Sequence, residues 1–240
     1  MYNLVINIKV NENLYNKDPQ SSTLGKRIIE HSVLMIDKIG LELFTFKKLA
    51  KEIKSTEASI YRYFENKHQL FVYLLNWYWE WLIARIELNT LNIADAATRL
   101  RIVIRVIVDA ANRNSEIEFV DEEALHRIVV QEGAKGYHHK TVDADNEEGF
   151  FLAFKRLVGN ISEIITEINP EFSYPRTLAS TMIETANNNL YYAEHLPRLT
   201  DINSEGTEEN LSDKVKKMIE VFCFGLIDCN DKISERRRSN

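Results

Sequence analysis

The segment 44–70 most constrains what this chain can fold into, because it reads as two short helices around a tight turn, followed directly by a longer helix. Thr45 is suited to begin the first helix, since its hydroxyl can accept a hydrogen bond from an otherwise unpaired amide. The apolar residues of 46–53 recur at i, i+3, i+4 and i+7, which is one face of a helix, while its lysines point elsewhere. The first short helix is therefore predicted to pack by one face and to carry a basic surface on the other.

A second short helix is predicted after the turn at Lys54 and Ser55, with Ser55 or Thr56 as its cap. Its buried side is expected among Ala58, Ile60, Tyr61 and Phe64, and its outward side among Thr56, Glu57, Ser59 and Arg62. A helix-turn-helix of this kind lays its second helix in the major groove of DNA. Small hydroxyls and an arginine at outward positions suit both base edges and phosphates.

The motif has a specific family resemblance. The run Leu49-Ala50-x-x-Ile53-x-Ser55-Thr56-x-Ala58-Ser59-Ile60-Tyr61-x-Tyr63-Phe64-x-Asn66-Lys67-x-x-Leu70 resembles, without a gap, the DNA-binding signature of the TetR family of one-component bacterial repressors. The resemblance covers roughly residues 24–72, and beyond them only length and helical character agree. It implies an all-α fold, with an N-terminal three-helix helix-turn-helix domain and a C-terminal helical ligand-binding and dimerisation domain.

The resemblance also implies roles for individual residues. In the family, the residues matching Tyr61 and Lys67 hold phosphates, the one matching Thr45 caps and touches the DNA backbone, and those matching Glu57, Ser59 and Arg62 lie where bases are read. The predicted DNA-binding set is Thr45, Lys47, Lys54, Thr56, Glu57, Ser59, Tyr61, Arg62 and Lys67. The chain departs from the family at the turn, where Lys54 replaces the usual glycine and Ser55 a small hydrophobe. A left-handed Lys54 costs about 1 kcal/mol, and its side chain can add a phosphate contact.

The distribution of charge agrees with this interpretation. The whole chain carries a net charge of −6, but residues 21–68 hold nine Lys or Arg and six Asp or Glu, a local charge of +3. Residues 69–240 hold 19 Lys or Arg and 28 Asp or Glu, a charge of −9. A basic surface confined to the motif favours docking on phosphate and discourages the remainder from lying on DNA.

Three segments are expected: an N-terminal arm at 1–20, the DNA-binding domain at 21–66, and the ligand-binding and dimerisation domain at 67–240. The arm alternates weakly over Leu4–Val10, which predicts a short strand or extended arm that docks on the body or pairs with a second copy; a disordered leader is the alternative. Helices are predicted over 22–39, ended by a left-handed Gly40, and over 67–91, 95–112, 119–131, 147–168, 175–195 and 208–229. The helix at 95–112 is apolar nearly all round and is expected to be central.

The resemblance implies that the larger domain encloses a cavity for a small-molecule inducer, whose binding releases the protein from its operator. Candidate lining residues are polar or aromatic groups on apolar helices: Trp77, Tyr78, Trp81, Arg101, Arg105 and His126. The plainer interpretation is that the aromatics are core and that the arginines pair or extend to solvent. The resemblance also implies a homodimer through the two C-terminal helices, with packing inside one chain as the alternative.

An alternative function is a helical hydrolase or metal enzyme that uses the cluster His138-His139-x-x-x-Asp143-x-Asp145-x-Glu147. The chain contains no Gly-x-Ser-x-Gly elbow, His-Glu-x-x-His pair or phosphate-cradling glycine loop to support it, so we expect no catalytic residue, metal or cofactor. A third possibility keeps the fold but makes the large domain a dimerisation module without an inducer. No signal peptide and no run of 18 apolar residues is present, which predicts a cytoplasmic protein without a membrane span.

Overall fold

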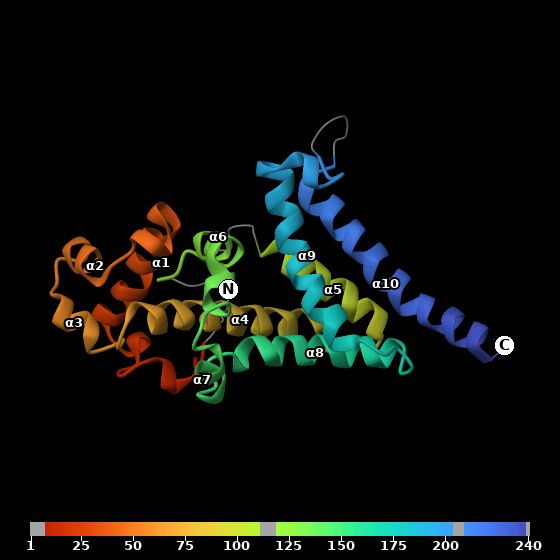
Figure 1. The fold of residues 1–240 in the computed structure, drawn as a ribbon, viewed down its shortest axis with the longest axis horizontal. Coiled ribbons are helices and arrows are strands. Elements are labelled where there is room, and N and C mark those ends of the chain that lie inside the picture. Colours follow the sequence, from red (N-terminus) through yellow and green to blue (C-terminus); the bar gives the residue numbers. More distant parts are fainter. Residues whose placement is uncertain (1–7, 111–118, 204–208, 239–240) are drawn as a thin grey trace. The chain divides into compact units, whose positions relative to one another are not determined.

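A computed structural model describes residues 8–110, 119–203 and 209–238 of the chain. Every regular element in these ranges is helical (Figure 1), which confirms the predicted all-α class. The α-helices are α1 (Thr23–Leu43), α2 (Phe46–Glu52), α3 (Glu57–Tyr61), α4 (Lys67–Thr90), α5 (Ala96–Asp109), α6 (Glu122–Glu132), α7 (Val142–Glu147), α8 (Leu152–Ile168), α9 (Pro175–His195) and α10 (Leu211–Arg238). Short 3-10 helices are η1 (Glu12–Leu14), η2 (Pro19–Ser21), η3 (Gly133–Gly136) and η4 (Pro197–Leu199).

The chain divides into two compact units. The first unit comprises Met1–Leu82 and Ala110–Lys155, and the second comprises Ile83–Asp109 and Arg156–Asn240. These are units of packing, and the division after residue 66 into a DNA-binding domain and a ligand-binding and dimerisation domain stays a prediction. The N-terminal two thirds of α4, up to Leu82, belong with α6, α7 and the N-terminal helices, and sequence periodicity carries no information about such long-range packing.

Helix α1 forms one wall of the first unit. Its N-terminal cap is Ser22, whose hydroxyl accepts a hydrogen bond from the amide of Gly25 at 3.2 Å. Gly40 has the positive φ of the predicted cap, 75°, but its ψ of 158° lies outside the left-handed helical region, and the chain resumes a helical turn to Leu43. Arg127 of α6 holds α1 through two bonds to the Asp37 carboxylate, at 2.9 and 2.8 Å, which raises the pKa of the guanidinium further above its usual value.

Helix α4 is the buried centre of the first unit. The ten consecutive side chains from Leu70 to Trp79 are each at most 5 % exposed. A helix that is apolar all round is stable only when other elements cover every face. The arrangement was predicted instead for the helix at 95–112, but that segment, α5, is amphipathic and exposes Arg101 and Arg105.

The N-terminal arm docks on the first unit. Residues 8–10 form no strand, contrary to one predicted alternative, and residues 1–7 of the predicted strand lie outside the described part. Ile8, Val10 and Leu14 are buried. Asn11 donates from Nδ2 to the carbonyl oxygen of Gly149 at 2.9 Å, which ties the arm to the segment between α7 and α8.

The second unit is built from α5, α9 and α10, with the C-terminal parts of α4 and α8. Helix α10 packs against both α9 and α5 (Figure 1). Helix α8 begins at Leu152 rather than at the predicted 147, because Gly149, with φ 78°, separates it from α7. Within the described residues, no helix is long and apolar enough to span a lipid bilayer.

Candidate nucleic-acid interface

The two short helices form as predicted, and both caps are present. The Thr45 hydroxyl accepts a hydrogen bond from the amide of Lys48 at 3.2 Å, and the Thr56 hydroxyl accepts one from the amide of Ser59 at 3.2 Å. Each bond satisfies an amide that has no partner inside its own helix. Lys54 has φ 51°, so the turn adopts the left-handed conformation that the family usually assigns to glycine.

Helix α3 turns one face inward and one face to solvent. Ile60, and Phe64 just beyond the end of α3, are fully buried. Ala58 and Tyr61 were also predicted as candidates for the buried side, but they are exposed. Because α3 has only five residues, its inward face holds a single side chain, and the core is completed by residues beyond its end.

The outward positions of α3 lie as the prediction requires. Thr56, Glu57 and Arg62 are exposed and Ser59 is half-buried. The hydroxyls of Thr56 and Ser59 lie 2.8 Å apart and share a hydrogen bond, so the hydroxyl that accepts this bond keeps its own O–H free to donate to another partner. The Tyr61 ring packs edge-on against Phe46 at 5.0 Å between centroids and is 49 % exposed, which fixes the ring while leaving it at the surface.

The basic side chains near the motif divide into two groups. Lys47 and Lys54 are exposed. The Lys48 Nζ instead donates to the carbonyl oxygen of Leu43 at 2.7 Å, and the Lys67 Nζ donates to that of Leu41 at 3.0 Å. Both ammonium groups therefore satisfy carbonyls at the C-terminal end of α1, where a helix leaves acceptors without partners.

The contacts of Lys67 and Lys48 with α1 were not predicted from the sequence. The signal that could have found them is the end of α1 itself, whose free carbonyls attract nearby lysines. A phosphate contact by Lys67 stays a prediction, and it requires the ammonium to reach DNA beside or instead of these carbonyls.

Two long-range contacts hold the motif in place, and neither was predicted. Arg27 of α1 donates to the carbonyl oxygen of Ile53, at the end of α2, with a distance of 2.6 Å. Asn16 of the arm donates from its amide to the Tyr63 carbonyl oxygen at 2.8 Å and from Nδ2 to that of Tyr61 at 3.3 Å. The C-terminal ends of both short helices are thus capped by groups outside the motif.

Comparison with known proteins agrees with this geometry. Residues 28–74, which include α2, α3 and the start of α4, match the sequence model of the family described as "Bacterial regulatory proteins, tetR family". Residues 28–74 are a DNA-binding segment of the TetR family. The match begins inside α1, so it covers the helices that present and support the motif.

Curated relatives resemble this chain over a limited stretch. The nucleoid occlusion factor SlmA of Salmonella paratyphi A is 32 % identical over 90 residues, which are 37 % of this chain and 46 % of that protein. SlmA of Haemophilus influenzae is 33 % identical over 75 residues, 31 % of this chain and 34 % of that protein. The matched stretch thus spans less than half the length of these relatives.

Solved structures share the fold over most of the chain. The fatty acid degradation regulator FadR from Bacillus halodurans has a TM-score of 0.60 at 15 % identity, covering 91 % of this chain and 98 % of that one. AibR, solved in complex with isovaleryl coenzyme A and operator DNA, has a TM-score of 0.56 at 16 % identity. The match covers 82 % of this chain and 97 % of the AibR chain. At these identities the likeness establishes the fold.

Four of the six predicted ligand-binding residues lie buried in the first unit: Trp77, Tyr78, Trp81 and His126. The structure brings two of them together, since the Tyr78 hydroxyl and His126 Nδ1 lie 2.7 Å apart. Burial, with a smaller contribution from the charge of Arg127, lowers the pKa of His126 to about 4. His126 is therefore neutral near pH 7, and the Tyr78 hydroxyl can donate to it.

The other two predicted ligand-binding residues, Arg101 and Arg105, belong to the second unit and are exposed on α5. Arg101 stacks over the Phe224 ring, 4.7 Å from its centroid, and its Nε lies 3.8 Å from a Glu220 carboxylate oxygen. The plainer interpretation of an arginine on an apolar helix, that it pairs at the surface, thus describes Arg101. A ligand contact by either arginine stays a prediction.

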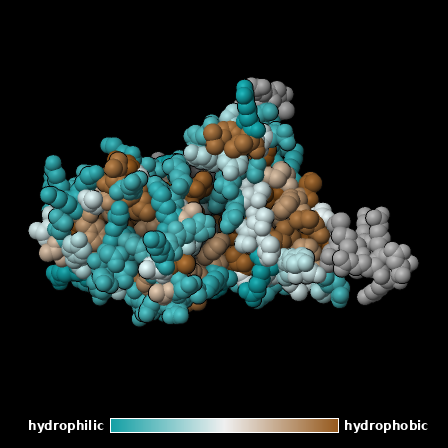
Figure 2. Space-filling view, in the orientation of Figure 1, coloured by the Kyte–Doolittle hydropathy of each residue, from teal (hydrophilic) through white to brown (hydrophobic). Residues whose placement is uncertain are grey.

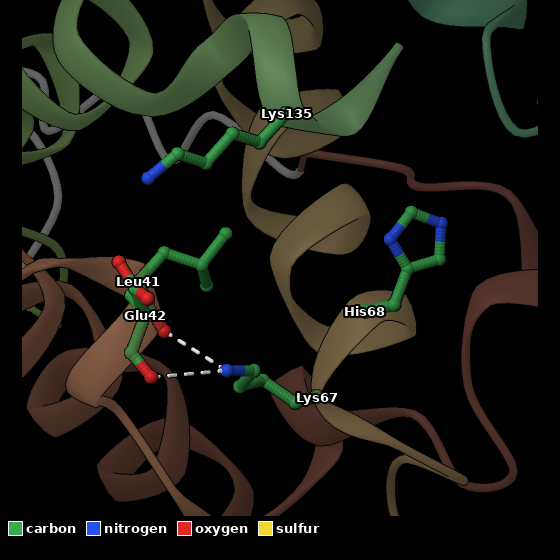
Figure 3. A pocket seen from close by; sticks show the side chains of 5 residues that line it. All are labelled: Leu41, Glu42, Lys67, His68 and Lys135. Carbon is green, nitrogen blue, oxygen red and sulfur yellow. Dashed lines mark hydrogen bonds between the residues drawn. The ribbon is translucent and has the colours of Figure 1, made fainter. Parts of the chain in front are cut away.

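A cavity of about 300 Å³ opens in the first unit, and the sequence analysis did not anticipate it. Figure 3 shows its lining, which comes from the end of α1, the start of α4 and η3: Leu41, Glu42, Lys67, His68 and Lys135. None of the six predicted ligand-binding residues is among these five. The cavity lies beside the end of α1 after the kink at Gly40, where the Lys67 ammonium binds the Leu41 carbonyl oxygen.

The proposed metal cluster at His138–Glu147 is only partly assembled. His138, Asp143 and Glu147 are exposed, whereas His139 and Asp145 are half-buried and lie close together. The segment contains the helix α7, on which Asp145 is half-buried. A third residue joins them from α4, His68, which the sequence analysis did not include.

Proposed function

We propose that this TetR-family chain is a sequence-specific DNA-binding transcriptional regulator, a homodimeric repressor that a small-molecule inducer releases from its operator. The observation that carries the proposal is the capped helix α3, whose outward residues Glu57 and Arg62 are free at the surface beside exposed lysines. A regulator of bacterial DNA acts in the cytoplasm, and the proposal assigns it no enzymatic activity and no cofactor.

The DNA contacts follow from the exposure of each side chain. Arg62 can donate two parallel hydrogen bonds to guanine, which is the commonest specific contact in the major groove. Lys47, Lys54 and the Tyr61 hydroxyl lie on the flanks of α3 and suit phosphates, which position the protein without reading sequence. We therefore assign the reading of base sequence to Arg62 and Ser59. The flanking residues Lys47, Lys54 and Tyr61 position the protein on the duplex.

The surface of α10 supports a homodimer. One stripe of this helix packs inside the second unit and is buried: Val215, Ile219, Cys223 and Ile227. A second apolar stripe remains at the surface, with Val221 75 % and Leu226 42 % exposed and Phe222 between them half-buried. Figure 2 shows hydrophobic surface on the visible face of the second unit. A second copy of α9 and α10 would cover such a stripe in a four-helix bundle.

An inducer can act only through differential affinity. A ligand that bound the DNA-competent and DNA-incompetent states equally would leave the operator complex unchanged. AibR, which shares the fold, was solved with both isovaleryl coenzyme A and operator DNA. We infer that this chain likewise binds a small molecule. The buried aromatic and polar residues proposed to contact it are Trp77, Tyr78, Trp81 and His126.

Electrophoretic retardation tests the DNA-binding function. Fragments from the promoter of the protein's own gene, and a genomic fragment library, should give a specific shift that weakens steeply between about 50 and 200 mM salt. Absence of a specific shift with every fragment would contradict the proposal.

Single substitutions test the assignment of roles. Arg62→Ala should cost about 1–3 kcal/mol on the operator and relax the preference at one base pair, because a base contact is lost. Tyr61→Phe should weaken binding on all sequences alike. The matched controls are Arg198→Ala and Tyr174→Phe, exposed residues of the second unit that should leave binding unchanged. An equal loss on every operator variant for Arg62→Ala would contradict its base-reading role.

A further inference from the structure

Two imidazoles converge on one carboxylate in the first unit. His68 Nε2 lies 2.5 Å from Asp145 Oδ2, and His139 Nε2 lies 3.5 Å from the same oxygen. The two rings meet edge to face, 4.7 Å between centroids. The three residues come from the first turn of α4, the turn after η3, and α7, so the fold rather than local sequence assembles them.

The spacing of these atoms suits a divalent transition metal. The three ligand atoms lie within 4.8 Å of one another. Nitrogen and oxygen ligands bound about 2.0–2.2 Å from a tetrahedral ion lie about 3.3–3.6 Å apart. His139 and Asp145 already have this separation. The His68 ring must move out by about 1 Å, which its side chain, 35 % exposed, leaves it room to do.

The groups that hold the His139 ring also suit a metal site. A histidine ligand almost always donates its other ring N–H to a hydrogen-bond acceptor, which fixes the tautomer that leaves the binding nitrogen free. The other ring nitrogen of His139, Nδ1, lies 3.1 Å from the Thr141 hydroxyl, which can accept that bond. His139 Nε2 meanwhile faces two oxygens, Asp145 Oδ2 and the Gly136 carbonyl at 3.2 Å. A metal ion bound at Nε2 would lie beside the Asp145 carboxylate oxygen that completes its ligand set.

We propose that His68, His139 and Asp145 form a binding site for a divalent transition metal ion such as Zn²⁺, Ni²⁺ or Co²⁺. Two imidazoles and one carboxylate are ligands that these ions accept, and the partial exposure of His68 leaves a position for water. The site is separate from α3, and it stands whether or not the chain regulates transcription.

An ion bound at this site would connect two elements of the first unit, α4 and α7. His68 follows Lys67, whose ammonium holds the carbonyls of Leu41 and Glu42 beside the cavity in Figure 3. Asp145 lies on α7, three residues before Glu148, which accepts hydrogen bonds from the arm. A bound ion therefore cross-links the start of α4 to the segment on which the arm is anchored, and it should stabilise the first unit.

The test uses the full chain, freed of any polyhistidine tag and of metal, titrated with Co²⁺. We expect one equivalent per chain, with visible d–d absorption of a site having nitrogen and oxygen ligands, and a higher melting temperature with Zn²⁺ than without. Asp145→Asn and His139→Ala should each weaken the Kd for Co²⁺ by more than about 10-fold, because loss of an outer-shell partner alone costs about 10–100-fold.

Matched controls separate this site from adventitious binding. His138→Ala and Asp143→Asn remove an exposed histidine and an exposed aspartate from the same segment, and both should bind Co²⁺ as the parent chain does. Circular dichroism of the metal-free variants checks folding, and the isosteric Asp145→Asn keeps the test decisive if His139→Ala fails to fold. Absence of Co²⁺ binding, or binding that Asp145→Asn leaves unchanged, would overturn the proposal.

Discussion

Acid should destabilise the first unit through His126, and the structure gives the size of the effect. The side chain is 5 % exposed, and its pKa of about 4 lies below the ordinary value of 6.5. As the pH falls through 6.5, the unfolded chain takes up a proton on this imidazole before the folded chain does, so protonation favours unfolding. The loss of stability begins near pH 6.5 and levels off below about pH 4. Between pH 7.5 and 5.0 it amounts to about 2 kcal/mol.

The assay is urea denaturation followed by tryptophan fluorescence at several pH values and one fixed protein concentration. All three tryptophans, Trp77, Trp79 and Trp81, lie on the part of α4 that belongs to the first unit, so the signal reports that unit. His126→Asn removes the titration and places an amide oxygen near the position of Nδ1, where the Tyr78 hydroxyl can still donate.

We expect the free energy of unfolding of the parent chain to fall between pH 7.5 and 5.0 by about 2 kcal/mol more than that of His126→Asn. His138→Asn, which changes an exposed histidine, should keep the full pH dependence of the parent. The same pH dependence in the parent chain and in His126→Asn would refute the assignment of acid sensitivity to this buried imidazole.

Three further predictions concern backbone positions, and urea denaturation checks each of them. Lys54→Gly should stabilise the chain by about 0.5–1 kcal/mol, since glycine adopts φ 51° without the strain of a side chain; unchanged or lower stability would contradict a strained turn. Gly25→Ala should destabilise by about 1–3 kcal/mol or more, because the new Cβ would lie 2.1 Å from the Pro19 carbonyl oxygen. Gly159→Ala, a helical position with nothing within 4 Å of the new Cβ, should instead stabilise by about 0.5–1 kcal/mol, and a loss there would count against this account.

The parts of the fold that the sequence predicted are those determined by neighbours along the chain. The threonine caps, the left-handed Lys54 and the bounds of α9 each depend on residues within about four positions. Helix periodicity identified most helices but misplaced the start of α8. It also named α5 rather than α4 as the helix buried on all sides, because both segments are rich in apolar residues and only tertiary packing distinguishes them.

The parts that the sequence could not predict depend on contacts between distant residues. His68 and Asp145 are 77 positions apart, and no spacing rule connects them. Lys67 was assigned to phosphate by resemblance, whereas the structure shows its ammonium on the carbonyls that end α1. A motif states which residue types are present, but the partners of a long, flexible lysine depend on which acceptors the fold leaves unsatisfied nearby.

The position of α3 in the first unit therefore depends on residues that the motif does not contain. A helix of five residues makes too few internal hydrogen bonds to be stable alone, so its orientation must come from its surroundings. Asn16 of the arm holds the carbonyls at its C-terminal end, and Ser22 holds the hydroxyl of Tyr63 at 2.8 Å. Because Asn16 and Ser22 precede residue 28, where the family match begins, the angle at which this chain presents α3 is determined in part by its own N-terminal arm.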